Sequence, residues 1–418
     1  MIKKILPVVF GLFCGVTSAQ EGTISPYSHY GLGEQKFRGI NEIKDMGGLA
    51  VYSDSLRINT LNPASYGQLQ RVTIAMGASM RETKVQNNTS SYKTNTGSIN
   101  YIALAVPVGK VGIAAGVSPY TFTGYKITDT FTENNIEYNN RFNGKGGINR
   151  AFVGAGYNVM ENFSVGAEVG IFFGTNEKSQ VKFIQDDGNE FPVQYGTVRR
   201  EDSRYTGFSY NFSAQYKHPL SKRKFLYANA TFSPESQLDR VQNRSINLLD
   251  ANYAIVQSSD LGEVQSKVTH PQNYSIGLGI GDPFKWFVGA EYAQRKTSVW
   301  NQIFTYSNAT YQDAYRVSVG GFYTPKFNSF TSLLSRMTYR AGFRYESTGL
   351  MINNVGVEEK AVTAGVGIPV GRFASNLNIG FEYGTRGALK NDMVKENYIA
   401  VSVGISLNDR WFEKRKFE

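Results

Sequence analysis

Residue patterns that could support catalysis or metal binding are scarce in this sequence. Its three histidines are His29, His218 and His270, and none has a second histidine at the spacing of a metal-binding pair. The motifs G-x-S-x-G and H-E-x-x-H and the Walker phosphate loop do not occur. A hydrolytic pair of a serine with His29 or His270 stays open, because one sequence does not show which residues meet in space. We expect a protein that is not an enzyme and has no cofactor and no metal site.

Two short segments resemble ligand-binding loops in composition. Residues 277–281 read G-L-G-I-G, but they lie in an alternating segment with no helix after them, which favours a structural role over phosphate binding. Residues 186–190 read D-D-G-N-E and could hold a calcium ion. The wider EF-hand spacing is missing there, so the segment fits a solvated loop tip better.

The composition indicates a β-rich protein. Of the 418 residues, 43 are glycine, 13% are aromatic and 19% are charged. This aromatic content is too high for a disordered chain, and the mean hydropathy of -0.32 is too low for a bundle of membrane helices. Glycine costs roughly 0.5–1 kcal/mol relative to alanine inside a helix, so frequent glycine favours strands. The net charge of +10 comes from scattered Lys and Arg, a pattern that favours anionic lipid head groups over nucleic acid in an exported protein.

The N-terminus predicts export from the cytoplasm. Lys3 and Lys4 precede an apolar run over residues 5–16, and small residues follow up to position 19. We expect residues 1–19 to be a cleaved signal peptide. A membrane anchor fits less well, because the run is shorter than the roughly 20 residues that span a bilayer. Cys14 follows Phe13 rather than a small residue, which argues against a lipoprotein and leaves a mature chain without cysteine.

The remaining chain repeatedly alternates apolar with small or polar residues. At the C-terminus, Ile399, Val401 and Val403 alternate with Ala400, Ser402 and Gly404, a period of two that is typical of strands. Such segments predict about fourteen strands of roughly ten residues between positions 71 and 408, the length that crosses a bilayer at a tilt. Short turns alternate with long polar connections, including those over residues 121–148, 174–203 and 233–271. This arrangement predicts an all-β, antiparallel transmembrane barrel in the outer membrane of a Gram-negative bacterium, with a periplasmic tail over residues 409–418.

A soluble β-sandwich would also alternate, but the second face of these strands argues against it. That face carries many glycines and several charged residues, which suit a filled lumen better than a solvated surface. Four of these charges are expected to point inward from the wall, where they form structural ties or bind a ligand carboxylate: Arg340, Arg344, Glu346 and Glu382.

Residues 20–70 lack the alternation and precede the first predicted strand. They contain Tyr30-Gly31-Leu32-Gly33 and, just before the wall begins, Asn62-Pro63-Ala64. Pro63 fixes its own φ and holds Asn62 in an extended conformation, so this motif forms a rigid corner, and an ordinary turn explains it equally well. Fifty residues are enough for a plug inside the barrel.

In these features the sequence resembles the FadL family of outer-membrane transporters for long-chain fatty acids and other hydrophobic compounds. The family has fourteen strands, an N-terminal hatch in the lumen and an Asn-Pro-Ala motif in that hatch. The resemblance implies that residues 62–64 and the glycines Gly31 and Gly33 belong to the hatch. It also implies a lateral exit at the third strand, where Ser118-Pro119 would weaken the pairing; the end of a strand explains this proline equally well.

The resemblance implies passive diffusion of a hydrophobic small molecule, gated by the hatch and released into the outer-membrane lipids. A second hypothesis is a non-transporting barrel that serves as a partner subunit or shuttle in an outer-membrane secretion or assembly complex, a use to which relatives of the family have been put. The long polar connections motivate it, because residues 233–271 hold few of the bulky apolar residues that a ligand-capturing mouth needs.

Overall fold

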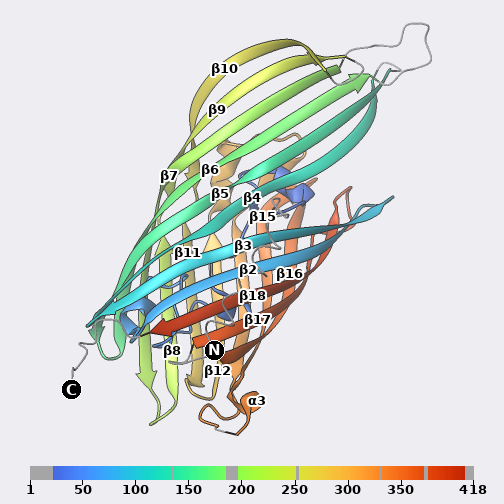
Figure 1. The fold of residues 1–418 in the computed structure, drawn as a ribbon. Coiled ribbons are helices and arrows are strands. Elements are labelled where there is room, and N and C mark those ends of the chain that lie inside the picture. Colours follow the sequence, from blue (N-terminus) through green and yellow to red (C-terminus); the bar gives the residue numbers. More distant parts are fainter. Residues whose placement is uncertain are drawn as a thin grey trace, which may run out of the picture.

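The computed structural model describes residues 22–133, 136–184, 196–250, 254–329, 331–370 and 375–409. The expected signal peptide, the segment 186–190 and all but the first residue of the expected tail lie outside these residues. Within them, eighteen strands form one sheet, and fourteen of these close into an antiparallel barrel because the last strand pairs with the first wall strand (Figure 1). This confirms the predicted fold. The wall strands are β2 (Val72–Gln86), β3 (Ser91–Val108), β4 (Val111–Glu133), β5 (Ile136–Met160), β6 (Phe163–Ile184), β7 (Gly196–Pro219), β8 (Phe225–Ser233), β11 (Asn273–Asp282), β12 (Trp286–Arg295), β14 (Ala314–Tyr323), β15 (Thr338–Ile352), β16 (Val355–Val370), β17 (Ser375–Arg386) and β18 (Lys395–Asp409).

Alternation gives each wall strand one face toward lipid and one toward the lumen. In β18, Ile399 and Val401 are 44% and 47% exposed, whereas Ser402 and Ser406 between the outward positions are buried. Outward aliphatic and aromatic side chains match the hydrocarbon layer, and inward small or polar ones leave room for the lumen contents. None of the helices in the described ranges has the length and apolar character needed to cross a membrane.

Five of the seven expected long connections are largely strand, among them those over residues 121–148, 174–203 and 233–271, and the sequence prediction was wrong there. Strands β4 to β7 run for 22 to 25 residues. Two further strands, β9 (Ser236–Leu249) and β10 (Ile255–His270), continue from β8 and toward β11. These parts project beyond the rest of the rim on one side (Figure 1). Their ladders continue past the apolar band, where lipid no longer demands one apolar face, so the alternation that predicts strands is lost.

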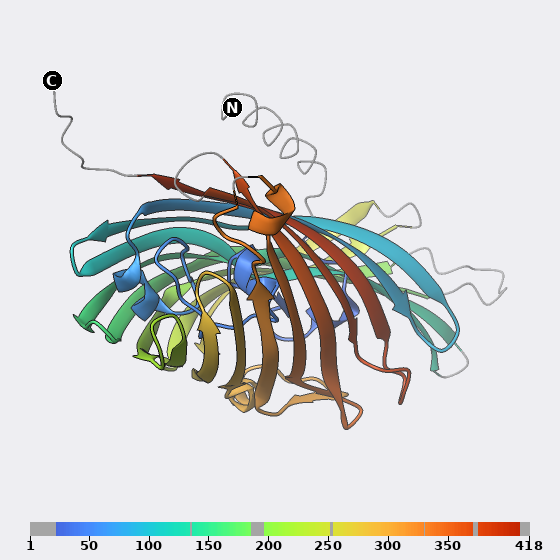
Figure 2. The same ribbon diagram turned by 90° about the horizontal axis from the view of Figure 1, so that it is seen from below.

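The N-terminal segment, residues 22–71, runs inside the wall (Figure 2). We call it the hatch; it contains η1 (Pro26–His29), β1 (Glu34–Gln35), α2 (Asn41–Lys44) and η2 (Pro63–Gln68). Apolar hatch residues such as Leu49, Val51 and Ile58 are 0–1% exposed. Outside the hatch, three short elements lie in connections: η3 (Thr297–Gln302), β13 (Ala309–Tyr311) and α3 (Leu333–Arg336).

Glycines in the wall let the hatch backbone approach it closely. A Cβ added to Gly112 would lie 1.8 Å from the carbonyl oxygen of Tyr66, and one added to Gly166 would lie 2.3 Å from the amide nitrogen of Ala64. These contacts involve backbone that cannot rotate away, so the two positions accept only glycine while η2 keeps its place.

Replacing Gly166 by valine should therefore displace η2 and destabilise the protein by about 1–3 kcal/mol, the usual cost of overpacking. The free energy of unfolding in urea, measured in detergent micelles, checks this. Gly356→Val is the matched control, because a Cβ there meets only the sulfur of Met351 at 3.5 Å. Equal stability of the two variants would contradict the close fit of η2.

Candidate functional site

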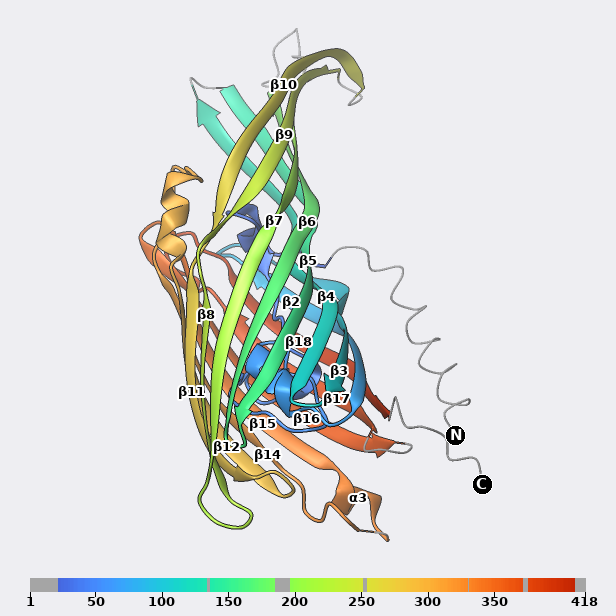
Figure 3. The same ribbon diagram turned by 90° about the vertical axis from the view of Figure 1, so that its left-hand side faces the viewer.

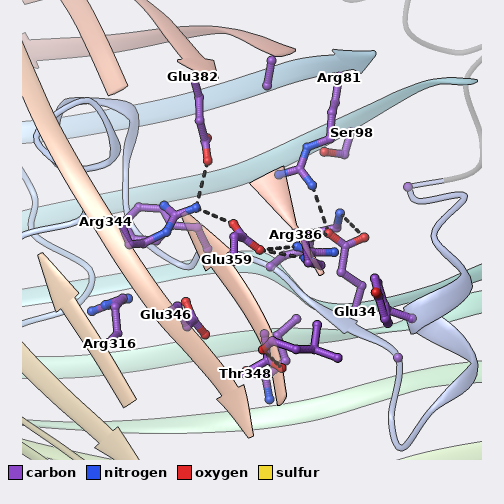
Figure 4. Close-up of a pocket in the computed structure, with 18 of the residues that line it drawn as sticks. Glu34, Arg81, Ser98, Arg316, Arg344, Glu346, Thr348, Glu359, Glu382 and Arg386 are labelled. Carbon is purple, nitrogen blue, oxygen red and sulfur yellow. Dashed lines mark hydrogen bonds and ion pairs between the residues drawn. The ribbon is translucent and has the colours of Figure 1, made fainter. Parts of the chain in front are cut away.

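A cavity lies inside the barrel, between the hatch and the wall formed by β2, β3, β12 and β14 to β18. It encloses about 1450 Å³, part of it open to solvent. Its lining contains many charged side chains of both signs (Figure 4), which come from the hatch and from six wall strands, beside aromatic and aliphatic residues such as Phe37, Trp300 and Leu350. The cavity is therefore an ionic site and differs from an apolar binding pocket.

Glu34 of the hatch is the centre of the first half of this site. Its Oε1 lies 3.0 Å from a guanidinium nitrogen of Arg81 in β2 and 3.0 Å from one of Arg386 in β17. Lys36 contacts its other oxygen at 3.1 Å, and the hydroxyl of Thr23 donates a hydrogen bond to it. Two hatch residues and two wall strands thus meet at one carboxylate.

Arg386 links Glu34 to the second half of the site. Its guanidinium lies 2.6 Å from Glu359 in β16 and 3.5 Å from Glu396 in β18. Arg344 in β15 then contacts both Glu359, at 2.9 Å, and Glu382, at 2.8 Å. The charges alternate in sign from the hatch across four neighbouring strands.

Further contacts complete the network, which we call the ionic cluster. Lys44, at the end of α2, lies 2.8 Å from Glu382, so the hatch enters the cluster at a second point. The hydroxyl of Tyr398 donates to Glu359 and Glu382 at 2.7 and 3.0 Å, and the guanidinium of Arg81 lies 4.2 Å from its ring centre. The hydroxyl of Ser25 donates to Glu396.

Burial makes these contacts strong. The side chains of Glu34, Arg344, Glu359 and Arg386 are 5–8% exposed. Burial alone raises the pKa of the Glu34 carboxyl, but the cations Lys36, Arg386 and Arg81 hold that pKa well below its usual range. The carboxylate therefore stays charged, and removal of one cation leaves a buried charge uncompensated.

The four predicted lumen charges lie on the inward face, but they do not form one group. Arg344 and Glu382 belong to the ionic cluster. Arg340 donates to Asn378 at 3.1 Å instead, and Glu346 lies 3.8 Å from Arg295. Each of the three described ion pairs of Arg344 and Glu382 has a protein side chain as its partner.

The sequence reasoning missed four central residues of the cluster. Arg81, Glu359 and Arg386 lie on the same alternating face as the inward glycines. They stand one or two residues beyond the ends of the strands predicted from the sequence, so slightly longer predicted strands would have included them. Glu34 had no such signal, because the hatch lacks a repeating pattern.

The Asn-Pro-Ala motif lies where the hatch meets β5, β6 and β7. Asn62 donates to Gln215 at 2.9 Å, and the amide of Ala64 donates to Ser213 at 2.7 Å. Pro63 begins η2, where its missing N–H is not needed. The motif thus places η2 against the wall, which is a structural role.

The hatch glycines lie near the opposite end of the hatch. Gly31 and Gly33 have φ values of +59° and +104°, a region that other residues rarely adopt. A Cβ on Gly33 would lie 2.6 Å from the carbonyl oxygen of Phe122 in β4. These glycines turn the chain into β1 and let it approach the wall.

Strands β3 and β4 separate partway along the wall. Their ladder ends at the pair Ile102 and Val117, directly before Ser118 and Pro119, and the β4–β5 register shifts just after Pro119. Pro119 does not end its strand, because β4 continues to Glu133. Above this point the hatch strand β1 pairs with β4, and the amide of Lys36 donates to the carbonyl of Tyr120 at 2.9 Å.

A second cavity lies beside the first and is also polar. It is lined by Arg38, His270, Glu291, Arg295 and Arg316, among others. Both of its carboxylates have protein partners: Glu291 accepts a hydrogen bond from the amide of Ala50 and lies 3.2 Å from Arg316, and Glu346 lies 3.8 Å from Arg295. Both cavities therefore combine charged side chains with apolar ones in their linings.

Solved structures share this fold at low sequence identity. The CymD monoaromatic hydrocarbon channel superimposes with a TM-score of 0.60 at 13% identity, over 91% of this chain and 100% of that one. The toluene transporter TodX of Pseudomonas putida gives 0.59 at 14% identity, over 90% and 98%. A Pseudomonas aeruginosa FadL homologue gives 0.57 at 14% identity, over 90% and 98%. The fold is that of the FadL-like outer-membrane barrels.

No curated protein matches this sequence. One family model, described as BamG, matches residues 1–418. Because that match spans the whole chain, the protein belongs to the BamG family.

Proposed function

We propose that this protein is a non-catalytic barrel subunit that works beside the outer-membrane protein assembly machinery and transports nothing itself. The observation that carries the proposal is the ionic cluster, which fastens the hatch to the wall at Glu34 and at Lys44. Opening a path through the lumen would require breaking several buried ion pairs, and each broken pair strands a charge in a poorly solvated place. The family name BamG supports the same function.

A second candidate is a passive channel for hydrophobic compounds such as long-chain fatty acids, gated by the hatch. Two observations favour it. The solved structures with this fold include channels for aromatic hydrocarbons, and β3 and β4 separate at Ser118-Pro119, where a lateral exit would lie. The charged lining of both cavities favours the first proposal over this one.

The fastening of the hatch is tested by Arg386→Met. This variant leaves Glu34, Glu359 and Glu396 without their shared cation, so we expect a loss of about 3–5 kcal/mol in the free energy of unfolding. Urea unfolding in micelles measures the loss, and protease digestion shows whether the hatch is released.

The control is Lys93→Met, which breaks the exposed pair of Lys93 with Glu82 at 2.8 Å. Exposed pairs contribute about 0–1 kcal/mol, so this variant should stay close to the parent protein. Similar losses in both variants would mean that the cluster does not fasten the hatch.

The two candidate functions are separated by one pair of measurements. Native mass spectrometry of the full-length protein, extracted gently from its own outer membrane, should show a stoichiometric complex with assembly-machinery subunits. Liposomes containing the purified protein should take up labelled palmitate and toluene no faster than empty liposomes. Faster uptake together with a monomeric extract would establish the channel and overturn the subunit proposal.

A further inference from the structure

Three neighbouring turns at one end of the barrel form a continuous surface. Pairing of β8 with β11, β11 with β12 and β12 with β14 brings together the turns at residues 220–224 and 283–285 and the connection at 324–337. The amide of Thr324 donates to the carbonyl of Lys285 at 2.7 Å and joins two of them. This is the end with short turns, which faces the periplasm in outer-membrane barrels.

Apolar side chains stand exposed on this surface, which we call the rim patch. Phe284 and Phe327 come from different turns, and their ring centres lie 5.5 Å apart. They are 63% and 48% exposed, and Leu334 of α3 is 67% exposed. Leu220 and Leu333 add to the patch at 50% and 46%. Phe284 and Phe327 thus contact each other across two turns and still face solvent, and a group of exposed apolar residues of this kind is typical of a surface that binds another molecule.

Lipid is a poor candidate for the molecule that binds the rim patch. The last outward side chains of β12, β14 and β15 are Trp286, Tyr323 and Tyr339, and aromatic residues at strand ends mark the border of the bilayer. Phe284 and Phe327 follow beyond this border in the turns. The connection that carries α3 projects past the strand ends (Figure 3).

Unpaired positive charge surrounds the apolar residues. None of the ion pairs between described residues includes an exposed cation of the rim patch. Among the described residues of these three connections and the strand ends next to them, the one acidic residue is Asp282, which is buried and accepts a hydrogen bond from the amide of Phe284 at 3.0 Å. The surface therefore lacks its own counter-charges. The exposed cations are Lys222, Arg223, Lys224, Lys285, Lys326 and Arg336.

We propose that the rim patch docks a periplasmic partner protein whose contact surface combines leucine or aromatic side chains with Asp and Glu. An apolar centre within a charged border is the usual anatomy of a protein interface, and opposite charge on the partner supplies orientation and specificity. The inference rests on the proposed function and adds the face of the barrel that the partner uses and the chemistry that recognises it.

The test uses full-length protein in its own host. A photo-crosslinking p-benzoylphenylalanine at position 327 should form one protein adduct, identified by mass spectrometry as the partner found in the native complex. That partner, purified, is then titrated against the purified barrel. Phe284→Ser with Phe327→Ser should weaken its binding by about tenfold or more, the loss expected when anchor residues are removed. Lys285→Glu with Lys326→Glu should weaken it similarly and more strongly at low salt.

The matched control is Met160→Ser, which removes a side chain of 68% exposure from the last residue of β5, at the same end of the barrel. It should bind the partner like the parent protein, and heat-modifiable gel migration shows that each variant is folded. A phospholipid adduct at position 327, or full binding by the Phe284 and Phe327 variant, would overturn the rim patch while the native complex persists. Absence of any complex with the parent protein would overturn the proposed function itself.

Discussion

The carboxylate of Glu34 is the constraint on which the architecture of the lumen depends. It stays ionised in a buried place because Arg81 and Arg386 contact it at 3.0 Å each. Arg386 in turn requires the carboxylates of Glu359 and Glu396, and Glu359 requires Arg344. Each charge is tolerated only because the next one is present, so hatch and wall form a single electrostatic unit.

The two faces of the barrel wall lie in different surroundings. Its outward residues meet lipid, so they are aliphatic and aromatic, while its inward residues meet the hatch and are small or polar. At Gly112 and Gly166 even a methyl group would strike the hatch backbone. The same wall thus provides charge for the ionic cluster and empty space for η2, and both features restrict the lumen to this particular hatch.

The sequence predicted the barrel well because lipid imposes alternation on every membrane-crossing strand. It failed above the lipid, where residues 121–133 pair with 136–148, and 174–182 with 197–205, in long ladders that have polar residues on both faces. Arg344 and Glu382 were recognisable as inward charges from their strand positions. Their meeting with Lys44 was not, since no periodic pattern relates the hatch to the wall. The exposure of the Phe284 and Phe327 side chains could not be predicted either, because it depends on turn geometry that cannot be read from a single sequence.

The connectivity of the ionic cluster also constrains the order in which the protein assembles. Arg386 meets Glu34 across 352 positions of the chain, and Ser25 meets Glu396 across 371. Loops of this length close slowly, and they close here only when β17 and β18 have reached the seam with β2. The hatch residues of the ionic cluster therefore depend on partners in the last two wall strands, whereas η2 packs against β5, β6 and β7, which come earlier in the chain. The strands that complete the cylinder thus also carry the charges that hold this part of the hatch.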